Sequence, residues 1–259
     1  MSARFDHEFW SNPGVDDLRS QSLADLFGPH VPIADHRHDS EPPPYEVEPS
    51  PYAAADGLSL FVPDNYEPNY AYPLIVWLPG QERHELPSLM AHISPQNYLG
   101  LALTHTPSLQ SLAEPGRGQR DTTALEDQLY DSVRQLRSCY HVHSERIYVA
   151  GFASGATAAL SLLLRRPEWL AGAVAMHGTL PDRRRSLARF RDLQGKRVLL
   201  ATGSQDHVTT ANHVVRTGRL LHSAGLSVTT RIDDAGRELT PSSLRQVDHW
   251  LMESLCVIA

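Results

Sequence analysis

Cysteine is scarce in this chain, which contains only Cys139 and Cys256. Two cysteines among 259 residues are too few for a disulfide framework, and neither belongs to a Cys-x-x-Cys or Cys/His zinc spacing. Long apolar runs are also missing, since the longest, from Ala156 to Leu164, is far shorter than the ~20 residues that cross a bilayer. These absences predict a reducing compartment and no membrane span.

The sequence also has no excess of positive charge. Its formal net charge is −7 and its pI is about 6.0, which gives no general attraction to nucleic acid or to an anionic membrane. The first residues, Met1 to Glu8, show no apolar run after a basic start, so no signal peptide is expected. The expected location is the cytoplasm.

Negative charge is concentrated in the first fifty residues, which hold ten acidic side chains and three arginines. Prolines recur from Glu41 to Pro51, where they favour extended polyproline geometry over helix. We expect residues 1–50 to form an acidic, proline-rich and partly irregular arm, followed by one domain over residues 51–259. The arm either packs along this domain or binds a protein partner.

From Tyr52 onward, short apolar runs alternate with helical patterns, which is typical of βαβ units and a mostly parallel sheet. A hairpin is expected around Asp56-Gly57. Further strands are expected at residues 74–78, 98–104, 147–150, 171–176, 198–202 and 226–232. Helices are expected at residues 122–139, at 155–165, from 211 to a left-handed cap at Gly225, and from 241 onward.

The turn between the strand at 147–150 and the helix at 155–165 reads Gly151-Phe152-Ala153-Ser154-Gly155. This frame matches G-x-S-x-G, the nucleophile elbow, in which a strained turn presents the central residue. Here the central residue is Ala153. From about Tyr52 to its end, the chain resembles α/β-hydrolases of the carboxylesterase, phospholipase and polyhydroxyalkanoate-depolymerase type. The resemblance implies a mostly parallel central sheet flanked by helices, without a large lid domain.

The resemblance implies where the other two members of a Ser-Asp-His triad belong. The segment Gly203 to Val208 is similar to the turn that carries the triad acid, which makes Asp206 its counterpart. The segment Gly236 to Pro241 is similar to the one that carries the histidine, and Arg237 stands at that position. Alanine offers no attacking oxygen and a guanidinium accepts no proton, so both reactive groups are missing.

Main-chain N–H groups do not depend on side-chain identity, so an oxyanion hole is still implied by the resemblance. Its expected members are Gly80, Gln81 and Ser154. Ser154 is expected to cap the following helix through its hydroxyl. The alternative is that Ser154 replaces the missing nucleophile, although Phe152 would then crowd the turn.

Three other side chains could act in the pocket above Ala153. His177 and His207 lie at expected strand ends and could approach the pocket as bases. Arg237 could pair with Asp206, or the pocket could bind a small anion. No metal site is expected, because His36 and His38 have no further ligands at a recognisable spacing.

A dense basic segment, Arg183 to Arg191, offers a second surface for a protein partner besides the N-terminal arm. It lacks the motif or aromatic interleaving of an RNA-binding surface. The sequence thus predicts a catalytically inactive esterase-like protein that acts as a binding or scaffold protein, without a cofactor. The alternative is a weak or atypical carboxylesterase that uses Ser154.

Overall fold

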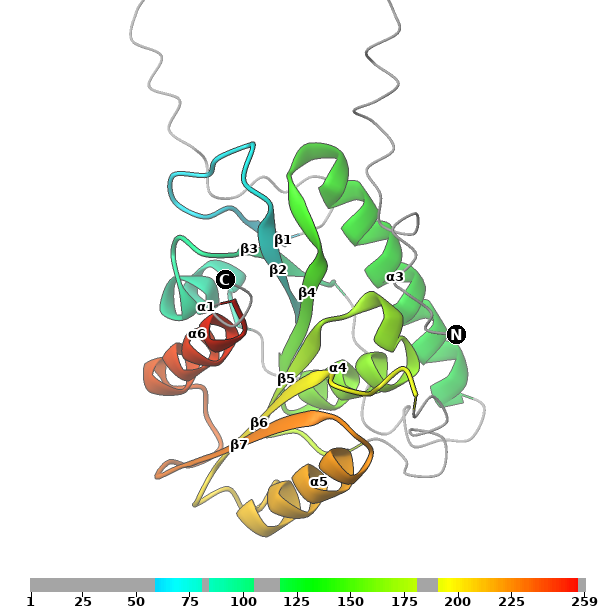
Figure 1. The fold of residues 1–259 in the computed structure, drawn as a ribbon. Coiled ribbons are helices and arrows are strands. Elements are labelled where there is room, and N and C mark those ends of the chain that lie inside the picture. Colours follow the sequence, from blue (N-terminus) through cyan, green and yellow to red (C-terminus); the bar gives the residue numbers. More distant parts are fainter. Residues whose placement is uncertain (1–58, 81–83, 105–116, 181–190, 256–259) are drawn as a thin grey trace, which may run out of the picture.

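The computed structural model describes residues 59–80, 84–104, 117–180 and 191–255. Within them, seven strands form one sheet in the order β1-β3-β2-β4-β5-β6-β7 (Figure 1). All neighbouring pairs are parallel except β1 with β3. The strands are β1 (Ser59–Phe61), β2 (Tyr72–Leu78), β3 (Leu99–Ala102), β4 (Val142–Phe152), β5 (Gly172–Met176), β6 (Arg197–Gly203) and β7 (Ser227–Asp233).

Five helices of the described residues cover the sheet: α1 (Leu86–Ile93), α3 (Arg117–Cys139), α4 (Ser154–Arg165), α5 (Ala211–Ser223) and α6 (Pro241–Leu255). Figure 1 shows α1 and α6 together on one side of the sheet and α3, α4 and α5 on the other. A short 3₁₀ turn, η3 (Pro167–Trp169), links α4 to β5. None of the described helices is long and apolar enough to span a membrane.

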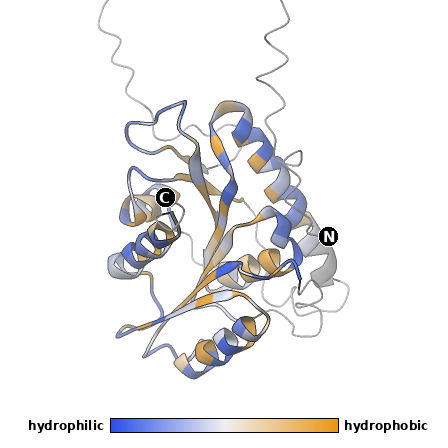
Figure 2. Cartoon of the chain, viewed as in Figure 1, coloured by the Kyte–Doolittle hydropathy of each residue, from blue (hydrophilic) through white to orange (hydrophobic). Residues whose placement is uncertain are grey.

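Two hydrophobic clusters hold these layers together, one on each face of the sheet. Alternate residues of a strand point to opposite faces. In β2, Leu74 and Val76 join the cluster under α3, α4 and α5, whereas Ile75 and Trp77 join the cluster under α1 and α6. Figure 2 shows the resulting hydrophobic colour along the central strands. Burial on both faces explains why these strands read as continuous apolar runs.

Helix α4 occupies the centre of its layer. Every residue from Ser154 to Leu164 is buried, as the all-round apolar pattern predicts. Helix α5 is amphipathic and leads to Gly225, whose φ of +87° is the left-handed conformation that the sequence predicts.

The sequence prediction was incomplete at one helix. Residues 86–93 form α1, for which the sequence analysis predicts no helix. Pro87 lies in the first turn of α1, where a missing N–H costs nothing. Of the expected hairpin, the structure describes one strand, Ser59–Phe61, and this strand pairs antiparallel with β3. The rest of that hairpin and the arm over residues 1–50 lie outside the described residues.

Candidate functional site

Four residues that the sequence singles out follow four neighbouring parallel strands. Ala153 follows β4, His177 follows β5, and Asp206 and Arg237 come after β6 and β7. The carboxyl ends of parallel strands meet at one edge of the sheet. Main-chain bonds tie the first two positions to it: Ala153 N–H donates to Met176 O over 2.9 Å, and His177 N–H donates to Ala201 O over 2.8 Å.

Ala153 lies on a sharp turn between β4 and α4, with φ 53° and ψ −110°. A non-glycine residue at positive φ is strained. Glycines make the turn possible, because a Cβ on Gly151 would lie 2.4 Å from Gly155 C and one on Gly155 would lie 2.1 Å from Leu78 O. The backbone of a nucleophile elbow is therefore present around an alanine.

Ser154 is buried and is the first residue of α4. The prediction that its side chain caps this helix is wrong, because the cap position belongs to Ala153 and no side chain caps it. The hydroxyl of Ser154 lies instead beside the end of β2: a Cβ on Gly80 would be 3.3 Å from Ser154 Oγ and 2.8 Å from Phe152 O. Gly80 and Ser154 are thus neighbours, whereas Gln81 lies outside the described residues.

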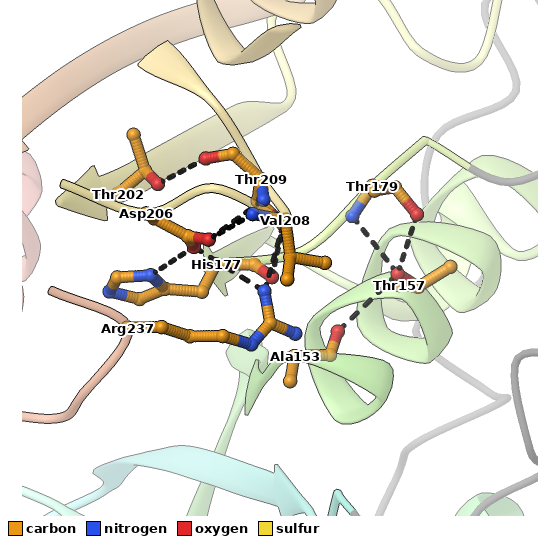
Figure 3. A network of polar contacts seen from close by, with 9 residues as sticks. All are labelled: Ala153, Thr157, His177, Thr179, Thr202, Asp206, Val208, Thr209 and Arg237. Atoms are coloured by element: carbon orange, nitrogen blue, oxygen red, sulfur yellow. Dashed lines mark hydrogen bonds and ion pairs between the residues drawn. The ribbon is translucent and has the colours of Figure 1, made fainter. Parts of the chain in front are cut away.

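Asp206 is buried and accepts hydrogen bonds from four donors (Figure 3). Its Oδ1 accepts from the main-chain N–H of Val208 at 2.8 Å and of Thr209 at 2.9 Å. Its Oδ2 contacts His177 Nδ1 at 2.7 Å and Arg237 Nη1 at 3.3 Å. Burial alone would raise the pKa of Asp206, but these hydrogen bonds and the nearby guanidinium hold it below its ordinary value.

Arg237 contacts the Asp206 carboxylate, as the sequence analysis expects, but through a single nitrogen. Its Nη1 donates to Asp206 Oδ2 and also to Thr209 Oγ1, over 3.1 Å. In the view of Figure 3, the guanidinium lies between Asp206 and Ala153. Its Cζ is 5.9 Å from the centre of the Phe152 ring, so the group sits over the elbow.

His177 is the second side chain on Asp206 and is 5% exposed. It also has a positive φ of 55°, and its carbonyl accepts from Thr209 Oγ1 over 2.9 Å. Figure 3 shows its ring extending away from Ala153. His207, the other histidine that the sequence proposes for the pocket, is exposed.

The sequence analysis missed two contributors to this site. Thr209 links the three polar residues, since its hydroxyl donates to His177 O and accepts from Arg237. Phe152 presents its ring to His177 at 5.2 Å, to His84 at 5.6 Å and to Arg237. An aromatic residue inside the G-x-S-x-G frame is the signal that could have pointed to this contact.

A cleft of about 140 Å³ opens between α1 and the start of α6. His84 lines it and also contacts Phe152, so the cleft lies next to the elbow. The other lining residues are Glu85, Ser88, Leu89, His92, Leu239, Pro241 and Leu244.

The described part of the chain contains no cluster of three His, Cys, Asp or Glu side chains that could hold a metal ion. His36 and His38 lie outside that part, as does most of the basic segment Arg183 to Arg191.

Solved structures share this architecture. The carboxylesterase of Bacillus cereus superposes with a TM-score of 0.58 at 24% identity, covering 71% of this chain and 89% of that one. Esterase PE8 superposes with a TM-score of 0.58 at 20% identity, covering 72% and 94%. The sheet order, the elbow and this similarity define an α/β-hydrolase fold.

Residues 53–232 match the model of the dienelactone hydrolase family. The chain belongs to this family. It is also 26% identical, over 182 residues, to the Bacillus subtilis (strain 168) protein named "Putative hydrolase MhqD", covering 68% of this chain and 90% of that protein.

Proposed function

We propose that this chain is a catalytically inactive member of its hydrolase family that acts as a binding or scaffold protein. The observation that carries the proposal is the methyl group of Ala153 on an intact elbow. Acyl transfer needs an attacking oxygen there and a proton acceptor beside it. Arg237 stands beside the elbow, and its guanidinium is a donor at every physiological pH.

The proposal is tested by ester hydrolysis and active-site labelling of the purified full chain. We expect hydrolysis of p-nitrophenyl acetate no faster than with a matched concentration of an unrelated protein. We also expect no covalent adduct with a fluorophosphonate probe. A stoichiometric adduct on any hydroxyl of this edge of the sheet contradicts the proposal.

The second candidate is a carboxylesterase-type activity that uses Ser154. Family membership favours it, as does the side chain of Ser154, which faces the end of β2 near Gly80. In this case the wild-type chain hydrolyses the ester and Ser154→Ala abolishes the activity. Ser161→Ala, a buried serine further along α4, is the matched control that leaves it intact.

Three of the sequence predictions stay predictions. They are the cytoplasmic location, a protein partner that binds the N-terminal arm or the basic segment Arg183 to Arg191, and a small anion bound in the pocket.

A further inference from the structure

Strand β7 lies at the outer end of the sheet, beside α5 (Figure 1). Among the described residues, it pairs with β6 alone. At one end of the strand, Ser227 N–H donates to Lys196 O over 2.9 Å, and at the other, Asp233 O accepts from Ser204 N–H over 2.7 Å. Successive residues of a strand direct their main-chain groups to opposite sides, so the odd-numbered residues of β7 face β6.

The even-numbered residues of β7 therefore direct their N–H and C=O groups away from the sheet. These residues are Val228, Thr230 and Ile232, and no strand of the described chain pairs with that side. A row of unpaired main-chain groups on an edge strand is suited to pairing with another chain. No proline interrupts the row, so each residue offers both a donor and an acceptor.

The side chains of the same three residues lie on the face of the sheet that α5 covers. A Cβ on Gly218 would be 3.0 Å from Thr230 Oγ1 and 3.6 Å from Val228 Cγ1, so this part of α5 lies over the strand. Ile232 is 46% exposed, although it is a large apolar residue. The edge thus combines free main-chain groups with uncovered apolar surface.

The flank of α5 that includes Gly218 is small and uncharged at its middle. Residues three and four apart share one side of a helix, which places Ala211 and Val215 on the flank of Gly218. Both are half-buried. The two arginines of α5, Arg216 and Arg219, are exposed on the side that faces solvent. A second α5 can therefore approach this flank without bringing the arginines together.

The sequence of β7 matches a second copy of itself that runs antiparallel about a two-fold axis at Thr230. In this register, Thr230 lies opposite Thr230 of the second copy, and Val228 lies opposite Ile232 of the second copy in both directions. Opposed residues of this kind exchange two main-chain hydrogen bonds. All the outward N–H and C=O groups of Val228, Thr230 and Ile232 are then paired, and each Ile232 is covered by a valine.

The other face of the strand supports the same register. Arg231 lies opposite Thr229 of the second copy, and Ser227 lies opposite Asp233, whose carboxylate can accept from the serine hydroxyl. An axis at Arg231 would instead place two guanidinium groups directly opposite each other, which is destabilising. An axis at Thr229 would pair only two of the three outward residues within the strand.

We infer that this edge binds a second copy of the chain, and that two copies form a symmetric dimer through β7 and the adjoining flank of α5. A two-fold axis closes the assembly, because each copy offers and receives the same surface. The two β7 strands run in opposite directions, so the carboxyl edges of the two sheets also point in opposite directions. The dimer does not depend on whether the chain hydrolyses esters.

Light scattering after size-exclusion chromatography and sedimentation velocity of the full chain test the inference. We expect the mass to rise with micromolar protein concentration from 28.8 kDa to twice this value. Thr230→Pro removes the N–H at the axis and keeps the bonds to β6, and proline is tolerated where an edge strand directs its N–H outward. This variant should stay monomeric where the wild type is dimeric, with the same circular dichroism spectrum.

Charge substitutions test the register. Thr229→Arg places a guanidinium opposite Arg231 of the second copy, twice in each dimer, and should raise the dissociation constant by about 2- to 30-fold. Adding Arg231→Glu to it restores pairs of opposite charge and should bring the constant back to within about threefold of the wild-type value. Gln135→Arg, exposed on α3, adds the same charge away from β7 and should leave dimerisation unchanged.

A monomeric mass at every concentration up to the millimolar range overturns the inference. A dimer that survives Thr230→Pro also overturns it, because the interface then lies elsewhere. If Thr230→Pro fails to fold, the charge variants decide. Equal dissociation constants for the wild type, Thr229→Arg and the double variant would exclude the β7 register.

Discussion

At the residue scale, Ala153 has a strained backbone conformation, and its methyl group contains no nucleophilic atom. Its φ of 53° with ψ of −110° lies outside the regions that L-residues favour. Strain of this kind costs of the order of 1–3 kcal/mol. An active enzyme of this fold presents its nucleophile by means of such a turn.

Relief of that strain is testable. Ala153→Gly should raise the free energy of unfolding by about 1 kcal/mol, because the strain that is removed exceeds the about 0.5–1 kcal/mol that glycine adds to the entropy cost of folding. Urea unfolding followed by circular dichroism measures the change. Ala158→Gly, in the middle of buried α4, should instead destabilise the protein. A less stable Ala153→Gly variant contradicts the expected strain.

Asp206 should make the free energy of unfolding of the protein depend on pH. Asp206→Asn removes the carboxylate that His177 contacts and the counter-charge of the Arg237 guanidinium, a loss of about 1–3 kcal/mol at pH 7. Because its folded pKa lies below the unfolded value of about 3.9, the carboxylate stabilises the fold fully above that pH.

This contribution disappears as the pH falls through the lowered folded pKa. The difference in unfolding free energy between wild type and Asp206→Asn should therefore shrink from pH 7 toward pH 2. Equilibrium unfolding across that range measures it. A difference that stays constant below pH 4 would show that the negative charge of Asp206 contributes nothing.

At the element scale, a buried ion pair network joins α3 to α4. The carboxylate of Glu126, which is 2% exposed, contacts Arg165 Nε, and it accepts from Arg166 Nε at 2.7 Å. Arg166 also lies over the Trp169 ring at 4.9 Å. These contacts connect α3 to the end of α4, the helix that begins directly after the elbow.

Glu126→Gln should destabilise the protein by about 1–3 kcal/mol, because two guanidinium groups lose their carboxylate while they remain partly solvated. Asp127→Asn, the exposed neighbour on α3, should change stability by less than about 0.5 kcal/mol. Thermal unfolding of the two variants checks this. Equal effects would mean that the buried network adds no specific stability.

Local sequence patterns defined most of these elements but not all of them. The runs that form β2, β5 and most of β6 are apolar because both faces of the sheet are covered, and this property can be recognised in the sequence. Helix α1 has only eight residues and begins with Leu86-Pro87, so its apolar positions are too few to separate a helix from a loop. Ser154 was misassigned because the helix begins one residue earlier than a serine cap requires.

At the scale of the whole molecule, the site depends on the order of the strands. Ala153, His177, Asp206 and Arg237 are spread over 85 positions of the chain, and the parallel sheet brings them to one edge. Family spacing alone predicts Asp206 and Arg237 as neighbours. It does not predict that His177 shares the same carboxylate oxygen, because that contact depends on the positive φ of His177 and on the position of Thr209.

The elbow backbone predicts that two substitutions raise the esterase activity of this chain. In the double variant Ala153→Ser with Arg237→His, the new hydroxyl stands on an elbow that already has the required turn. The new imidazole starts from a position whose present side chain reaches Asp206 Oδ2. Asp206 can orient that imidazole so that its other nitrogen accepts the serine proton.

We expect the double variant to react with a fluorophosphonate probe and to hydrolyse p-nitrophenyl acetate. Ala153→Ser alone should be slower by about 10²- to 10⁴-fold, the usual contribution of a general base. Ala153→Ser with Arg216→His supplies a histidine on α5, away from Asp206, and should behave like the single variant. Equal rates in all three would mean that position 237 cannot deliver a base to the elbow, because His177 already holds the Asp206 oxygen that a new histidine needs.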